Sequence, residues 1–106
     1  MNNEQIAFDR EGFLVNLRDW NQTVAQQIAT EHMIELTDDH WLVIEALRNF
    51  YHDTDVAPAM RPFVKLVRTE VKESLGNSIE LMALFGDSPA KMAARIAGLP
   101  RPTNCL

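Results

Sequence analysis

The feature that most constrains this chain is a stretch after Thr37 that reads as a helix with apolar residues on most of its circumference. Thr37 is a favourable N-cap residue, and Asp38 and Asp39 follow it at the positive end of the expected helix dipole. The apolar positions of the stretch are Trp41, Leu42, Val43, Ile44, Ala46, Leu47, Phe50 and Tyr51. Other elements must cover such a helix, so the sequence predicts that it is the central, buried helix of the fold.

Most of the remaining sequence also has helical patterns. Capping residues and apolar spacing predict four further helices, which begin near residues 19, 60, 77 and 88. We expect Asp19 to cap the first of them, Gly76 to end the second and Gly98 to end the last. The sequence therefore predicts a mainly α fold, with a compact helical bundle over about residues 19–97.

The two ends of the chain depart from this helical pattern. Two short apolar pieces flank a polar turn with Gly12, which predicts a small N-terminal β-hairpin over about residues 5–16. After Gly98, the prolines at 100 and 102 exclude a helix and favour an extended, flexible C-terminal arm over residues 98–106. Because no linker divides the 106 residues, we expect one domain over 1–106.

The composition argues against several classes of function. The net charge of −5 opposes strong direct binding to nucleic acid, which depends on a concentrated positive surface. No apolar run approaches the roughly 18 residues of a membrane span, and the first residues lack the pattern of a signal peptide. We therefore expect a cytoplasmic protein. His32, His40 and His52 lack metal-ligand spacing, so we expect surface, capping or packing roles for them and no metal or cofactor.

Cys105 is the strongest candidate for chemistry. It is the only cysteine of the chain and its second-to-last residue, so an internal disulfide is excluded. A thiol near a chain end is a hazard unless its reactivity is used, and its thiolate would be the nucleophile. Position alone leaves two interpretations open, a reactive thiol or an incidental cysteine at a frayed tail. A nearby cation such as Arg101 could raise the thiolate fraction.

One helix face carries a second pattern. Arg61, Lys65, Arg68 and Lys72 recur at intervals of four, three and four residues, which places four cations on one side of a helix. This face could dock an acidic partner or RNA phosphates, or it could simply be solvated, since acidic residues lie nearby. The break at residues 53–60 is long for a helix-turn-helix, so DNA binding is a weak interpretation.

The last ten residues closely resemble the ending of a known family. The segment 97–102 reads Ala-Gly-Leu-Pro-Arg-Pro and precedes a penultimate cysteine, as in the DsrC/TusE sulfur-relay proteins. Further segments that match the family in order are Asp9–Leu14, Asp19–Trp20, Ile34–Trp41, Ala57–Pro58 with Arg61, and Leu84–Phe85. The resemblance covers nearly the full chain, and it implies a small hairpin packed on a helical bundle.

The resemblance also implies a function. Members of the TusE branch pass sulfur toward the wobble uridine of certain tRNAs. Cys105 would accept sulfur as a persulfide from an upstream complex similar to TusBCD. It would then pass the sulfur to a tRNA thiouridylase similar to MnmA with its bound tRNA, for 2-thiolation of the uridine. This implies a cofactor-free sulfurtransferase, and we expect a monomer when free, with Arg61, Lys65, Arg68 and Arg101 as partner-binding residues.

A departure from the family pattern bears on the branch. Dissimilatory members carry a second cysteine eleven positions before the penultimate one, and here that position is Ala94. A chain without it cannot close an intramolecular disulfide, which favours the TusE branch. Two alternatives stay open. An accessory (gamma, DsrC-type) subunit of a dissimilatory sulfite reductase would share the fold but need the missing thiol. A non-catalytic helical regulator that binds nucleic acid would use the cationic face and not Cys105.

Overall fold

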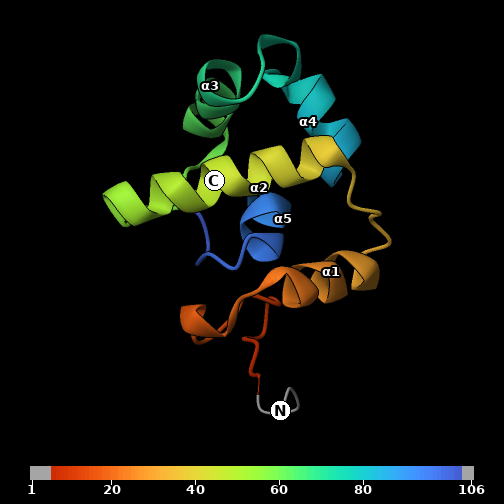
Figure 1. The fold of residues 1–106 in the computed structure, drawn as a ribbon, viewed down its shortest axis with the longest axis vertical. Coiled ribbons are helices and arrows are strands. Elements are labelled where there is room, and N and C mark those ends of the chain that lie inside the picture. The colour runs from red at the N-terminus through yellow and green to blue at the C-terminus, as the bar shows by residue number, and fades with distance from the viewer. Residues whose placement is uncertain (1–5, 104–106) are drawn as a thin grey trace.

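Five α-helices and two short 3₁₀ helices make up most of residues 6–103, which are the residues that the computed structural model describes (Figure 1). The α-helices are α1 (Gln22–Glu31), α2 (Asp38–Thr54), α3 (Met60–Glu70), α4 (Ser78–Phe85) and α5 (Pro89–Ile96). The 3₁₀ helices are η2 (Leu17–Asp19) and η3 (Glu73–Leu75). The predicted mainly α class is confirmed, and none of the helices in this part of the chain is long and apolar enough to cross a membrane.

The helix that the others surround is α5, and not α2 as the sequence predicted. Figure 1 shows α2 across the middle of the molecule, with α3 and α4 on one side and α1 on the other. Helix α5 contacts all four other α-helices. Its alanines, including Ala93 and Ala94, are buried and allow the neighbouring helices to approach closely. Helix α2 keeps an exposed face with Leu42, Glu45 and Asn49, because its polar residues interrupt the apolar circumference.

The start of α1 also differs from the prediction. Asp19 belongs to η2, and the N-cap of α1 is Asn21, whose side-chain oxygen accepts a hydrogen bond from the Val24 N–H at 2.9 Å. The capping motif was correctly expected in this region, but its position was wrong by two residues. The predicted N-cap of α2, Thr37, is confirmed.

The predicted β-hairpin is reduced to a turn closed by a single bridge. Phe8 and Leu14 form an isolated antiparallel bridge, and no strand occurs between residues 6 and 103. The Asp9 carboxylate explains the tight turn, since it accepts hydrogen bonds from the N–H groups of Glu11 and Phe13, each at 2.9 Å. Gly12 has φ +87°, as its predicted position in the turn requires. Residue 5, the first of the predicted hairpin, lies outside the described residues.

Helix α3 ends at Glu70 and does not reach Gly76. The chain turns back after Val71, and the Arg68 guanidinium donates two hydrogen bonds to the Gly76 carbonyl, at 3.2 and 3.0 Å. A Cβ atom at Gly76 would lie 2.4 Å from Arg68 Cβ, so only glycine permits this close return. As a result, Lys72 lies beyond the helix, and the four predicted cations do not share one helical face.

His40 joins the start of α2 to the end of α4. Its Nδ1 accepts from the Thr37 N–H at 3.0 Å, and its Nε2 donates to the Leu84 carbonyl at 2.7 Å. These two bonds require the tautomer with the proton on Nε2, since a carbonyl can only accept and a backbone N–H can only donate. The ring is buried and meets Phe85 edge-on at a centroid distance of 5.1 Å. The predicted capping or packing role is therefore confirmed for this histidine.

We expect His40→Ala to lower the free energy of unfolding by about 2 kcal/mol or more, because it removes the partner of the partly buried Leu84 carbonyl and opens a cavity. Urea denaturation measures the loss. His52→Ala, at an exposed position near the end of the same helix, is the control and should stay within about 1 kcal/mol of the unchanged protein. Equal losses in the two variants would contradict the structural role assigned to His40.

Candidate functional site at the base of the C-terminal arm

The candidate catalytic residue, Cys105, lies outside the described residues, which end at Thr103. The structure instead shows what leads the chain toward it, which is the end of α5 and residues 98–103. These residues determine where the last described position of the chain lies and how firmly it is held.

The end of α5 is closed by backbone hydrogen bonds of the Schellman type. The Leu99 N–H donates to the Ala94 carbonyl at 2.9 Å, and the Gly98 N–H donates to the Arg95 carbonyl at 3.2 Å. Gly98 has φ +74°, a left-handed conformation that glycine adopts without strain. The prediction that Gly98 ends the last helix is confirmed, and the motif directs Leu99 back toward the core.

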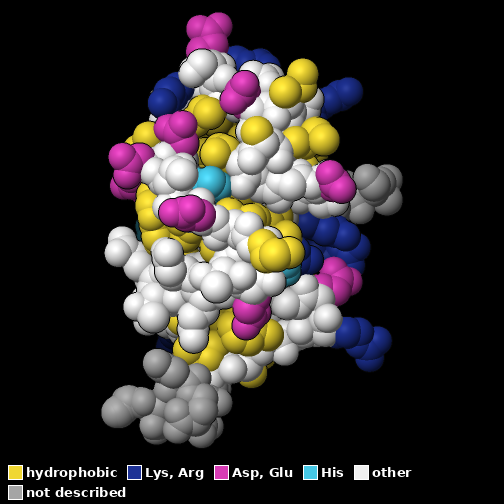
Figure 2. All heavy atoms as spheres, turned by 90° about the vertical axis from the view of Figure 1, so that its right-hand side faces the viewer, with side chains coloured by type: hydrophobic (Ala, Val, Ile, Leu, Met, Phe, Trp, Pro, Cys, Tyr) yellow, Lys and Arg dark blue, Asp and Glu magenta, His cyan; other side chains and the backbone are white. Residues whose placement is uncertain are grey.

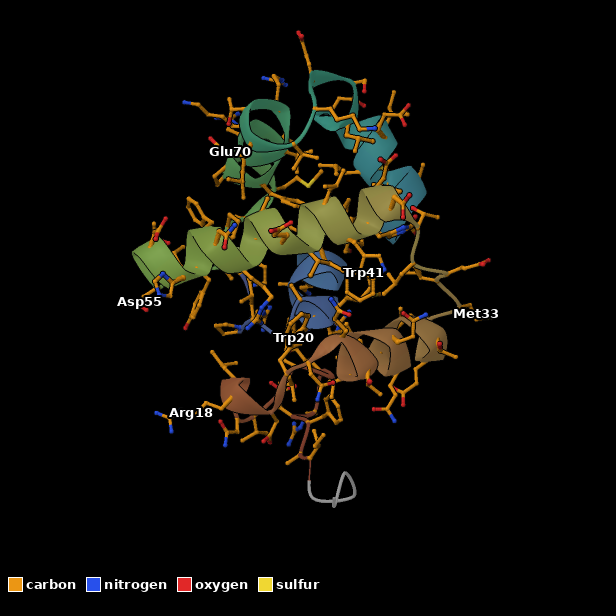
Figure 3. The ribbon with its side chains drawn as sticks, in the orientation of Figure 1. Arg18, Trp20, Met33, Trp41, Asp55 and Glu70 are labelled. Atoms are coloured by element: carbon orange, nitrogen blue, oxygen red, sulfur yellow. The ribbon has the colours of Figure 1, made fainter. Side chains whose placement is uncertain are left out.

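Two side chains from distant parts of the sequence bind the remaining carbonyls at this helix end. Trp20 Nε1 donates to the Ile96 carbonyl at 2.9 Å, and Arg48 Nη1 donates to the Ala97 carbonyl at 2.7 Å. The Arg48 guanidinium also lies over the Trp20 ring, 3.8 Å from its centroid, in a cation–π contact. We call Trp20, Arg48 and Gly98 the α5 clamp. Figure 3 shows Trp20 between α1 and α5.

The α5 clamp combines electrostatic and steric constraints. A cation is favourable at the negative end of a helix dipole, so Arg48 stabilises α5 by its charge as well as by its hydrogen bond. Burial lowers the pKa of Arg48 from its ordinary value. A Cβ atom at Gly98 would lie 2.2 Å from Trp20 Cδ1, so the indole also occupies the space that any larger residue would need.

The first residues of the arm are packed against the bundle, which contradicts the prediction of a flexible arm from residue 98 onward. Leu99 is only 2% exposed and belongs to the hydrophobic core, and Pro102 is also buried. The Thr103 N–H donates to the Ala57 carbonyl in the α2–α3 connection at 3.3 Å. The arm lacks regular structure as predicted, but the burial of Leu99 and Pro102 holds its first residues against the bundle. Residues 104–106 lie outside the described part.

The N-terminal turn also contacts the arm. Arg101 Nη1 lies 3.1 Å from Glu11 Oε2, and Arg95 Nε donates to the Glu11 carbonyl at 2.8 Å. Arg101 was predicted both to bind a partner and to act on the thiol. The structure shows that its guanidinium is paired with Glu11, although both side chains remain about half exposed.

The predicted cationic face is divided by the structure. Arg61, Lys65 and Arg68 line one open groove between α3 and the start of α4, which we call the basic groove. Its other lining residues are Met60, Pro62, Val64, Thr69, Asn77 and Ser78. Lys72 is not among them, and its Nζ lies 3.0 Å from Asp39 Oδ1 on α2. Three of the four predicted cations therefore stay together.

The remaining predicted positions are Ala94, His32 and His52. Ala94 is 1% exposed, and its carbonyl accepts the hydrogen bond from Leu99, so it lies beneath the start of the arm. His32 and His52 are exposed. Within residues 6–103 there is no group of three or more His, Cys, Asp or Glu side chains that could hold a metal ion.

Sequence reasoning missed Arg48 and Glu11, although Arg48 left a signal. On α2 it follows Ile44 by four residues and Leu47 by one, so a charged residue interrupts the apolar face that enters the core. A cation in such a position needs a buried acceptor, and the end of another helix is a suitable one. Glu11 gave no comparable signal, since an acidic residue in a polar turn is common.

Comparison with known proteins assigns the family. The family model described as DsrC like protein matches residues 1–106. The chain belongs to the DsrC family. It is 43% identical to a protein of Buchnera aphidicola from Acyrthosiphon pisum named sulfurtransferase TusE, over 97% of this chain and 90% of that protein. It is 41% identical to a sulfurtransferase TusE homolog of Haemophilus influenzae, over 100% of this chain and 97% of that protein.

Two solved structures of DsrC family members have the same fold. The NMR structure of Allochromatium vinosum DsrC has a TM-score of 0.89 and 43% identity, and it covers 100% of this chain and 95% of its own. The crystal structure of the oxidized gamma-subunit of the dissimilatory sulfite reductase from Archaeoglobus fulgidus has a TM-score of 0.82 and 39% identity. It covers 95% of this chain and 92% of its own.

We expect Gly98→Ala to destabilise the protein more than Gly86→Ala. Both glycines have positive φ, +74° and +89°, but an added Cβ meets Trp20 at Gly98 and nothing within 4 Å at Gly86. The backbone cost of about 1–3 kcal/mol applies to both, and the clash adds about 1 kcal/mol or more at Gly98 only. Thermal and urea unfolding compare the two. If Gly86→Ala lowers the stability as much as Gly98→Ala does, the close contact between Gly98 and Trp20 does not contribute the expected steric cost.

Proposed function

We propose that this chain is a sulfur carrier of a tRNA thiolation relay, a sulfurtransferase that holds sulfur as a persulfide on Cys105. The observation that carries the proposal is a sole cysteine at the penultimate position of a DsrC family chain. Relatives that match it over nearly their whole length are named sulfurtransferase TusE. A cytoplasmic location follows from this function.

Overall similarity does not separate the two branches of the family. Identity is 43% both to the Buchnera aphidicola sulfurtransferase TusE and to Allochromatium vinosum DsrC. The cysteine count favours the sulfurtransferase. With alanine at position 94, this chain has no second thiol to form an internal disulfide with Cys105. An accessory subunit of a sulfite reductase that depends on such a disulfide is therefore the less favoured function.

The chemistry of a single-thiol carrier is balanced without an oxidant or a reductant. In loading, the Cys105 thiolate attacks the outer sulfur of a donor persulfide, a new S–S bond forms on Cys105, and the donor thiolate leaves. In delivery, an acceptor thiolate attacks the outer sulfur of Cys105 persulfide, and the Cys105 thiolate leaves. Each step breaks one S–S bond and forms another, so one sulfur atom moves and the carrier returns to its starting state.

The geometry at the base of the arm supports this role. Cys105 follows Thr103 by two residues, and two residues extend a chain by at most about 7 Å. Thr103 is exposed and is held by one hydrogen bond of 3.3 Å, whereas Leu99 is anchored in the core. A partner can therefore draw the chain beyond Pro102 into its own active site at a small cost, while the bundle stays folded.

The partners of the relay are a donor complex similar to TusBCD and a tRNA thiouridylase similar to MnmA with its bound tRNA. We assign Arg61, Lys65 and Arg68 of the basic groove to binding a protein partner. Arg101 has the same role when its guanidinium leaves Glu11. The net charge of −5 favours protein contacts over direct contacts with tRNA phosphates. The same charge disfavours a regulator that binds nucleic acid through this face.

Incubation with a competent donor complex should add about 32 Da, one sulfur atom, at Cys105 and nowhere else, because the thiolate is the nucleophile. Intact-mass and peptide mass spectrometry locate the change, and a thiol reductant should remove it. Cys105→Ser is the control and should stay unmodified with an unchanged unfolding midpoint. A Cys105→Ser protein that still delivers sulfur, or an unchanged protein that never gains the mass, would refute the carrier role.

Reversal of two basic-groove charges, Arg61→Glu with Lys65→Glu, should slow sulfur transfer several-fold at low ionic strength and less at high ionic strength. Both side chains are exposed and form no ion pair with another described residue, so the fold should be unaffected. The control is Arg10→Glu with Arg18→Glu, which changes the net charge by the same amount. Tight binding of the unchanged protein to bare tRNA at physiological salt would contradict the assignment to a protein partner.

A further inference from the structure

We propose that a second groove, between α2 and α3, docks a basic segment of the protein that accepts the sulfur. We call it the acidic groove. The inference rests on the proposed carrier function and adds a surface that is separate from the basic groove. The two grooves share only Thr69, and they otherwise use different residues of α3.

The acidic groove has an apolar floor and acidic walls. The exposed Leu42 and the partly buried Phe50 and Leu66 form the floor, and the carboxylates belong to the exposed Glu45, Asp53 and Glu70. The α2 residues of this set recur every three to five positions, so they share one helical face. Figure 3 shows Glu70 on α3, on the side above the C-terminal half of α2. Half-buried apolar groups with a charged rim are typical of a surface that binds an amphipathic segment.

The negative charge of this groove is not compensated within the described part of the molecule. None of its lining residues is lysine or arginine. Lys72, the cation that follows α3, lies 3.0 Å from Asp39 instead. Glu45 and Glu70 form no ion pair with any residue between 6 and 103, and Asp53 pairs there only with its neighbour His52, at 3.4 Å. Three carboxylates on one groove attract a cationic partner and repel nucleic acid.

The position of the groove relates it to the arm. Asp53 ends the groove at the C-terminal end of α2, four residues before Ala57. The Ala57 carbonyl is the group that holds Thr103, the last described residue before the carrier cysteine. A partner segment that lies along the groove therefore reaches toward the point where the arm leaves the bundle. Such docking would bring the partner thiol to the arm rather than to a remote face.

The chemistry of the two relay partners indicates which of them fits. An enzyme that binds tRNA needs a concentrated positive surface for the phosphates, whereas a donor that only passes sulfur does not. A helix or strand at the rim of that positive surface, with apolar side chains between its Lys and Arg residues, complements the acidic groove. The acceptor would then bind on one side of α3 and leave the basic groove free for the donor.

The side view in Figure 2 shows a surface that belongs to neither groove. It shows the face that carries α4 and the α1–α2 connection, where hydrophobic and acidic side chains are interspersed. Ile79 and Met33 are the most exposed large apolar residues among those described, at 76% and 93%. They do not line either groove, so they can be left unchanged in the test.

The test compares two double variants of the full chain with equal net charge. Glu45→Lys with Glu70→Lys reverses the groove, and Glu31→Lys with Glu35→Lys reverses two exposed carboxylates elsewhere. Each substitution adds two charge units, so both variants change the net charge from −5 to −1. Binding is measured against the tRNA thiouridylase loaded with tRNA, and donor-dependent persulfide loading of Cys105 is measured in parallel.

We expect the groove variant to bind the thiouridylase about tenfold more weakly at low salt, with a smaller difference at high salt. The affinity of the control variant for the thiouridylase should stay within about twofold of that of the unchanged protein. Both variants should load sulfur from the donor normally. The inference is overturned if both variants lose affinity equally, if the groove variant binds the thiouridylase normally, or if it loses donor loading instead. Failure of the carrier function itself would appear differently, as absent sulfur transfer by the unchanged protein.

Discussion

The hydrogen bonding of the last turn of α5 is the constraint on which the rest of this structure depends. A helix end leaves carbonyl groups without partners in the helix, and burial of such a group unsatisfied costs about 1–3 kcal/mol. Here the carbonyls of residues 94–97 are all satisfied, two by the backbone of Gly98 and Leu99 and two by Trp20 and Arg48. Because these partners come from the chain before α1, from α2 and from the arm, one helix end fixes three parts of the molecule relative to each other.

In this arrangement, different parts of the chain form the base, the path of the arm and the two grooves. The bundle from α1 to α5 provides a rigid base, and residues 98–103 provide a path along its surface that ends near the α2–α3 connection. Helix α3 presents cations to one groove and a carboxylate to the other. A carrier that meets two partners in turn can use such a division, since opposite charges on two surfaces favour different proteins and disfavour wrong encounters.

The parts of the fold that sequence predicted are those encoded within a few residues. The cap at Thr37, the helix start at Pro89 and the stop at Gly98 all depend on neighbours in the chain. Contacts between distant residues could not be predicted, such as that of Trp20 with Ile96, 76 positions away. The central place of α5 was missed for the same reason, because its alanines gain their burial from neighbours. The site residue Cys105 came from the family ending, and the sequence alone could not reveal that Leu99 and Pro102 are packed.

The anchoring of Leu99 has a mechanical consequence. A partner that pulls on the end of the chain must first break the one hydrogen bond of Thr103. It must then expose the buried ring of Pro102, and finally remove Leu99 from the core. Among the described residues of the arm, the resistance to such a pull therefore increases from Thr103 to Leu99. The distance that the carrier cysteine can move is limited by the length of chain beyond Leu99. To reach farther, the whole bundle would have to move toward its partner.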